Sequence, residues 1–172
     1  MFDVDEFIDE CLTAVREPEP RAAVHETLER AMARREEIRL ALPVTDDVLT
    51  TLHRSPELTV LQVVWSPGLS VQPHEHQMFA GIGIYAGQED NTFYRRTGAR
   101  VERAGGRSLR TGDVAVLGPD AVHSVVNPLS APTAAIHVYG GDLFAPVRKS
   151  WDPETLDEIE GAFDPGAAVG DR

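Results

Sequence analysis

Two histidines separated by one residue, His74 and His76, are the side chains of this chain best suited to chemistry. On an extended segment, residues i and i+2 point to the same side, so both imidazoles can converge on one metal ion. A third imidazole, that of His123, follows farther along the chain. Three neutral imidazoles leave a divalent ion with its full charge and with open coordination positions, which is typical of a catalytic site. For His74 and His76 taken alone, two surface histidines on a strand are the alternative.

The composition is typical of a soluble globular protein. The chain has 172 residues, 42% hydrophobic and 26% charged, which suits one domain with a sizeable core. The acidic N-terminus is unlike a signal peptide, and no apolar run approaches the length of a transmembrane helix, so we expect no membrane association. The single cysteine, Cys11, cannot form an internal disulfide, which favours a cytoplasmic location. The net charge of −12 argues against nucleic acid as a partner.

Two helices are predicted in residues 1–43. Apolar residues recur at helical spacing from Phe2 to Val15, and Pro18 and Pro20 break that helix. A second apolar stripe, which runs from Val24 to Leu42, predicts one further helix that stops before Pro43.

Short β-rich runs follow, with glycine and proline turns between them. The predicted strands are Leu58–Trp65, Met78–Tyr85, Asn91–Thr97, Val114–Leu117, His123–Val126 and Thr133–Tyr139. Many short strands without intervening helices indicate a sandwich or a barrel. Asp152 followed by Pro153 predicts a short C-terminal helix. We therefore expect one domain overall, with N-terminal helices in 1–43, a barrel in 44–150, and a short helix and flexible acidic tail in 151–172.

The β-rich region resembles the cupin superfamily in two motifs. Gly68 precedes His74-Glu75-His76 in the first motif, and in the second Gly112 precedes His123. The resemblance implies a mainly β fold, the cupin jelly-roll (double-stranded β-helix) barrel, here with two N-terminal helices. It also implies that His74, His76 and His123 are the metal ligands.

The resemblance leaves this site without a carboxylate ligand. The position of the glutamate that cupins usually carry holds Ala80 or Gly81. Glu75 lies between two of the histidines and should point to the opposite face of its strand.

Within the cupins, the chain is similar to the thiol dioxygenases, that is, cysteine dioxygenase and 3-mercaptopropionate dioxygenase. It is also similar to a bacterial group of predicted metal-dependent enzymes of this fold. The matching stretches lie between Leu58 and Asp142, about half of the chain, and comprise residues 65–68, 73–76, 83–89, 89–96 and 136–142. The resemblance implies Fe(II) as the cofactor, with Ni, Zn and Mn as alternatives, and a small-molecule thiol and O2 as partners. It is compatible with a monomer or a homodimer.

The thiol dioxygenases carry a Ser-x-His-x-Tyr relay beside the iron. His137 and Tyr139 match its last two members, whereas Ala135 stands at the serine position. The resemblance implies that His137 and Tyr139 are catalytic, with the tyrosine hydroxyl near bound oxygen or substrate and the histidine orienting it. The alternative is an ordinary barrel strand in which a neighbour satisfies an inward-facing His137.

The substrate clamp stays unassigned, because no arginine stands near residues 48–50, where the resemblance to cysteine dioxygenase would place it. The available polar candidates are His53, Arg54, Gln62, Tyr94, Arg95 and Arg96.

The leading hypothesis is an Fe(II) dioxygenase that converts a small thiol to a sulfinate. One alternative is a cupin metalloenzyme with other chemistry on a small organic acid, which the missing clamp and Ala135 favour. The other alternative is a non-catalytic metal-binding cupin.

Overall fold

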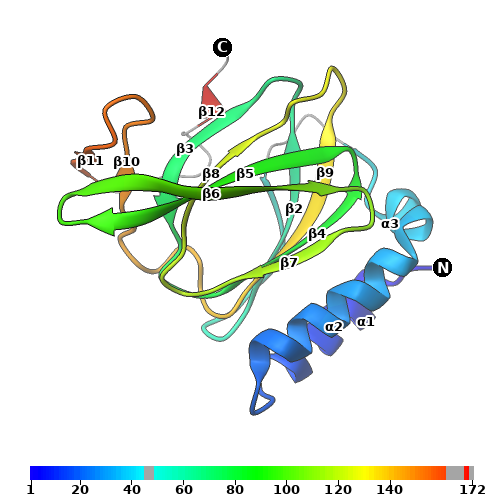
Figure 1. Cartoon of the computed structure of the whole chain (residues 1–172). Coiled ribbons are helices and arrows are strands. Elements are labelled where there is room, and N and C mark those ends of the chain that lie inside the picture. The colour runs from blue at the N-terminus through cyan, green and yellow to red at the C-terminus, as the bar shows by residue number, and fades with distance from the viewer. Residues whose placement is uncertain (45–48, 162–168, 171–172) are drawn as a thin grey trace.

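A β-barrel with helices along one side forms the protein (Figure 1), and the computed structural model describes residues 1–44, 49–161 and 169–170. The helices are α1 (Val4–Ala14), α2 (Pro20–Ala33) and α3 (Arg35–Ala41). The strands are β1 (Leu49–Arg54), β2 (Thr59–Trp65), β3 (Ser70–Glu75), β4 (Ala80–Ala86), β5 (Gln88–Thr97), β6 (Arg100–Arg110), β7 (Val114–Leu117), β8 (Val122–Val126), β9 (Thr133–Tyr139), β10 (Ser150–Trp151), β11 (Glu158–Ile159) and β12 (Val169–Gly170).

The helices begin where the sequence supplies a cap or a proline. The Asp3 carboxylate accepts hydrogen bonds from two amides of the first turn of α1, and Pro20 opens α2. The prediction of a single second helix was wrong, because Arg34 has φ −106° and ψ 25°, outside the helical region, and separates α2 from α3. After this break Ile38 is still fully buried, so the apolar stripe is kept by two shorter helices.

Two antiparallel sheets build the barrel. The first has the strand order β1-β2-β9-β4-β7, and the second has the order β11-β10-β3-β8-β5-β6, with β12 pairing β3. Of these strands, β1, β6 and β10–β12 were not predicted, and β3 was expected only as the extended segment that carries His74 and His76. Strand β6 is largely exposed and β1 is half-buried, so neither carries the continuous apolar run by which the others were recognised.

Strands β2, β4 and β9 are buried on both faces because helices cover their outer side. Along β9, Ala134, Ile136 and Val138 pack into the cluster that contains the helices. The alternate residues Ala135 and Tyr139 pack into the second cluster, inside the barrel. Because side chains alternate across a strand, His137 shares this inner face. The helices therefore seal one face of the sheet and leave the other to the barrel interior.

Substituting Gly81 in β4 by alanine is expected to destabilise the protein by about 1–3 kcal/mol, because it overpacks the contact with α2. A Cβ at Gly81 would lie 2.8 Å from Leu28 and 2.9 Å from Val24. Urea denaturation measures the change in the free energy of unfolding. Gly105→Ala is the matched control, since no heavy atom lies within 4 Å of its added Cβ. Equal stability of the two variants would show that α2 does not need this close approach.

A turn replaces the helix predicted after Asp152, so this prediction was wrong. The Asp152 carboxylate accepts hydrogen bonds from the amides of Glu154 and Thr155, at 2.8 and 2.7 Å, as an N-cap would. Leu156 then adopts φ 62°, which ends any helix, and β11 returns to pair with β10. Of the predicted tail, residues 162–168 and 171–172 lie outside the described part, and Val169–Gly170 pairs with β3.

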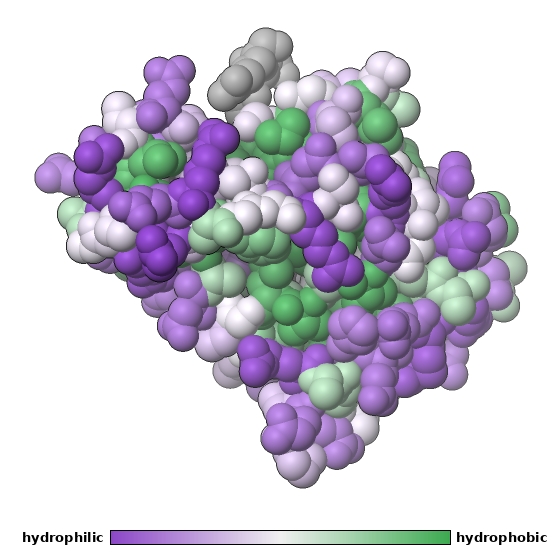
Figure 2. All heavy atoms as spheres, in the orientation of Figure 1, coloured by the Kyte–Doolittle hydropathy of each residue, from purple (hydrophilic) through white to green (hydrophobic). Residues whose placement is uncertain are grey.

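A groove of about 1070 Å³ runs between α1 and α2 and is lined mostly by acidic side chains. Hydrophilic side chains predominate over this region in Figure 2. The groove holds none of the histidines considered above. Among the described residues, no helix is both long and apolar enough to cross a membrane.

Candidate metal centre

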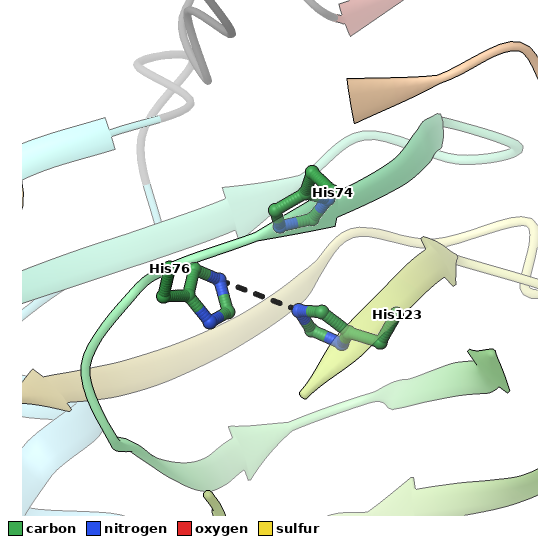
Figure 3. A group of neighbouring side chains, drawn as sticks. All are labelled: His74, His76 and His123. Atoms are coloured by element: carbon green, nitrogen blue, oxygen red, sulfur yellow. Dashed lines mark hydrogen bonds between the residues drawn. The ribbon is translucent and has the colours of Figure 1, made fainter. Parts of the chain in front are cut away.

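The second sheet brings the three predicted histidines together (Figure 3). His74 lies on β3 and is the register partner of His123 on β8, while His76 follows the end of β3. The β3–β8 register shifts between Val71 and His74. A bulge at this place can re-aim side chains, and it accommodates Pro73 within a strand. All three imidazoles are buried.

The spacing of the ring nitrogens fits one metal ion. One ligand atom from each of His74, His76 and His123 lies within 4.8 Å of the others. The Nε2 atoms of His76 and His123 are 3.4 Å apart. Two nitrogens held at ~2.1 Å from one ion with tetrahedral or octahedral angles would be separated by roughly 3.0–3.4 Å. The group could therefore hold a metal ion without rearrangement of these two rings.

Hydrogen bonds at Nδ1 orient two of the three histidine rings. Nδ1 of His74 is 2.8 Å from the Gln72 carbonyl, and Nδ1 of His123 is 2.7 Å from the Asn91 amide oxygen. Because both partners are acceptors, each Nδ1 carries the proton and each Nε2 keeps its lone pair for a metal.

Burial keeps the three rings neutral. It lowers the pKa of His74 to about 4, with the Gln72 hydrogen bond acting in the opposite direction. Burial, with the mutual repulsion of the rings, lowers the pKa of His76 and that of His123 well below the ordinary value. At neutral pH all three imidazoles are therefore deprotonated, as metal binding requires.

Glu75 anchors the segment between the two neighbouring ligands. As expected, its carboxylate points away from the metal site, where it forms an ion pair with Arg96. It also accepts hydrogen bonds from the side chain of Gln77, at 2.6 Å, and the amide of Lys149, at 3.1 Å. The ligand segment is thereby tied to β5 and to the chain that leads into β10.

His137 and Tyr139 lie beside the three histidines. The Tyr139 hydroxyl is 3.0 Å from Nδ1 of His137, and its ring centroid is 5.3 Å from that of His76. Burial raises the pKa of Tyr139, and the positive charge of Arg148 opposes that rise only in part, so the phenol stays protonated. His137 and Tyr139 therefore lie on the face of β9 that adjoins the histidine cluster.

A small cavity of about 30 Å³ opens onto this cluster. Its polar lining is His74, His76, His123, His137, Tyr139 and Arg148, and its apolar lining is Leu49, Leu61, Val63, Trp65, Val71, Val125 and Leu143.

Arg148 is the lining residue that the sequence did not point to. Its side chain is 4% exposed, and its charge acts on the pKa of Tyr139 and of His74. It follows an irregular segment after β9, where no periodic pattern signals which way a side chain points.

The candidates for a substrate clamp lie elsewhere. None of them lines the cavity. Arg54 pairs with Asp142, Arg95 with Glu102 and Arg96 with Glu75. Gln62 bonds to Tyr85 on the helix-covered side of the sheet, Tyr94 contacts Ser124, and the His53 side chain is half-buried on β1.

Comparison with known proteins identifies the fold. No family model matches the chain. An RmlC-like cupin family protein of Methanocaldococcus jannaschii with a double-stranded β-helix fold is similar, with 13% identity, 59% of this chain and 86% of that chain covered, and a TM-score of 0.50. An uncharacterized conserved protein with a double-stranded β-helix domain from Klebsiella pneumoniae has 13% identity, 73% and 89% coverage, and a TM-score of 0.47.

Oxalate decarboxylase of Bacillus subtilis has 20% identity and a TM-score of 0.44 over 51% of this chain, which spans only 22% of that longer protein. At these identities the similarity concerns the fold and not the chemistry. The two antiparallel sheets and the likeness to the M. jannaschii protein together establish that this chain has the mainly β, cupin double-stranded β-helix fold predicted from its sequence.

Proposed function

We propose that the protein is an Fe(II)-dependent dioxygenase that oxidises a small thiol bearing an anionic group to the sulfinate. One observation carries this proposal: three neutral imidazoles, a protonated tyrosine and a buried guanidinium line the same small cavity. This set offers a metal site, a hydrogen-bonding group and an anion-binding group within reach of one small molecule.

An Fe(II) ion held by three imidazoles would supply the redox chemistry that joins a thiol and O2. The overall reaction is R–SH + O2 → R–SO2H, in which both oxygen atoms end on sulfur. Sulfur loses four electrons and O2 accepts them, so no further reductant is needed. Ni, Zn and Mn remain the alternative ions for the same ligand set.

Arg148 would bind the anionic group of the substrate. A guanidinium offers several N–H donors in a fixed planar fork, which matches a carboxylate with two parallel hydrogen bonds. Because Arg148 is buried beside neutral imidazoles, a bound carboxylate would meet its charge with little solvent screening. A carboxylate held there would leave the thiol end of a short molecule to face the three histidines.

His137 and Tyr139 would position the reacting end of the substrate. The Tyr139 hydroxyl is hydrogen-bonded to His137, and Tyr139 lines the cavity together with His76. With its proton directed at His137, the hydroxyl oxygen can accept a hydrogen bond from the thiol and so orient the sulfur. The apolar lining excludes water from the reacting atoms, which strengthens these polar contacts.

The cavity limits the size of the substrate. A volume of about 30 Å³ is room for about one water molecule, so a bound thiol must be short and must displace lining side chains.

Oxygen uptake tests the proposal. The protein is loaded with Fe(II) without oxygen and then exposed to O2 with a panel of thiols: 3-mercaptopropionate, cysteine and cysteamine, which lacks a carboxylate. We expect thiol-dependent uptake with one O2 consumed per sulfinate formed, and faster uptake with the carboxylate-bearing thiols. Propionate, which lacks sulfur, is the matched control. If no thiol on the panel raises uptake above the rate with propionate, the thiol dioxygenase proposal is wrong.

A second candidate is a metalloenzyme that acts on a small organic acid without a thiol. The buried Arg148 favours it equally, and Ala135 in place of the relay serine favours it over a thiol oxygenase. The absorption spectrum of the Co(II)-loaded protein separates the two. Thiolate binding would add a sulfur-to-cobalt charge-transfer band, whereas a carboxylate alone would not.

A further inference from the structure

A buried carboxylate, Glu89 at the start of β5, lies at the centre of a polar network that joins both halves of the site. It is 0% exposed. Its Oε2 accepts a hydrogen bond from Trp65 Nε1 at 2.8 Å, and its Oε1 accepts one from Asn91 Nδ2 at 2.8 Å. Its Oε2 also lies 3.8 Å from Nε2 of His137, which has no hydrogen-bond partner among the described residues.

We propose that Glu89 is the positioning residue of this site: it fixes the metal ligand His123 through Asn91, and it fixes Tyr139 through His137. The His123 arm needs only that a metal binds. The Tyr139 arm rests on the proposed function.

The His123 arm follows from the donors and acceptors available. A carboxylate can only accept, so the Asn91 amide must turn its NH2 toward Glu89. The Asn91 oxygen is then left facing Nδ1 of His123, at 2.7 Å, and can only accept there. His123 must therefore carry its proton on Nδ1, and its Nε2 lone pair is directed at the position between the three rings.

The His137 arm follows the same logic. The negative charge of Glu89 favours a proton on Nε2 of His137, the ring nitrogen that faces it. A neutral His137 then has its lone pair on Nδ1 and accepts the hydrogen bond of the Tyr139 hydroxyl, at 3.0 Å. The separation of 3.8 Å is longer than a hydrogen bond, and catalytic contacts often tighten only when substrate binds. Tyr139 is thereby left with its oxygen lone pairs toward the cavity.

Glu89 thus takes the place that a serine at position 135 would fill. Ala135 faces the barrel interior but has no polar atom, so it cannot orient His137. Glu89 comes from the other sheet and reaches the same imidazole. Although burial favours the neutral acid, the pKa of Glu89 is lowered because His137, Asn91 and Trp65 stabilise the charge.

Metal affinity and ring protonation test this inference without any thiol. In Glu89→Gln an NH2 group replaces one of the two oxygens that accept hydrogen bonds from Trp65 and Asn91. The orientation of the Asn91 amide is then no longer fixed. We expect the Zn²⁺ affinity, measured by competition with a chelator, to fall roughly 10- to 100-fold. In the metal-free protein, ¹⁵N NMR should show protons on Nδ1 of His123 and Nε2 of His137, and the variant should show mixed tautomers at both rings.

A double substitution tests the donor and acceptor order along Glu89, Asn91 and His123 directly. Glu89→Gln combined with Asn91→Asp exchanges the amide and the carboxylate, so a carboxylate faces Nδ1–H of His123 and receives the new NH2 group. We expect most of the lost Zn²⁺ affinity to return. Tyr85→Phe is the matched control, because it removes a buried hydrogen bond to Gln62 on the far side of the sheet.

Three results would overturn the inference: unchanged affinity and tautomers in Glu89→Gln, an equal loss in Tyr85→Phe, or no recovery in the double variant. A failure of thiol oxidation would leave these measurements untouched, so the two proposals fail separately.

Discussion

Replacing His76 by alanine is expected to abolish stoichiometric metal binding and, with it, any thiol-dependent oxygen uptake. His76 would supply one of three ligands, and its Nε2 lies 3.4 Å from that of His123. Losing a ligand removes a direct bond to the ion, so the effect should exceed the roughly 10- to 100-fold that loss of an outer hydrogen-bond partner costs. Elemental analysis after dialysis, together with Zn²⁺ titration, measures the change.

His25→Ala is the matched control for this prediction. His25 lies on α2, where its ring is 3.6 Å from the Glu29 carboxylate of the same helix, and its substitution should leave metal content and uptake unchanged. Circular dichroism establishes that both variants are folded. Full metal occupancy in a folded His76→Ala protein would mean that the three histidines are not the metal site.

Replacing Arg148 by glutamine is expected to weaken the use of carboxylate-bearing thiols far more than that of cysteamine. Removal of one partner of a buried, hydrogen-bonded charge pair costs about 2–5 kcal/mol. At about 1.4 kcal/mol for each tenfold change, kcat/KM should fall roughly 30- to several-thousand-fold, mainly through KM. Steady-state oxygen uptake with both kinds of thiol measures the difference.

Two further variants separate binding from structure in this prediction. Arg54→Gln removes an arginine that pairs with Asp142 and does not line the cavity, so it should have little effect. Arg148→Lys keeps the charge but loses the planar fork, and should fall between the wild type and Arg148→Gln. An equal loss with both kinds of thiol, at unchanged metal content, would exclude Arg148 as the anion-binding group.

The histidine cluster could be predicted because its signal is local. One residue between His74 and His76 sets them on one side of an extended segment, and the resemblance of residues 112–127 to the second cupin motif implied His123. The alternation along β9 likewise put His137 and Tyr139 on one face of the strand.

Other features could not be predicted because they depend on contacts between distant segments. Arg148 points into the cavity from an irregular stretch, and Glu89 reaches His137 from the opposite sheet. Neither side-chain direction follows from the two-residue alternation of a strand or from the 3.6-residue period of a helix. The helix expected after Asp152 shows a different failure: the capping residue is present, but Leu156 ends the turn and tertiary pairing forms β11 instead.

The ion pair of Glu75 with Arg96 has a consequence for how the protein acquires its ion. Because that carboxylate also accepts hydrogen bonds from Gln77 and Lys149, the segment that carries His74 and His76 is held in place before any cation binds. Binding of an ion then does not have to order this segment, so no free energy is lost to folding and the affinity is higher. Such preorganisation would let stripped protein be reloaded directly, without refolding.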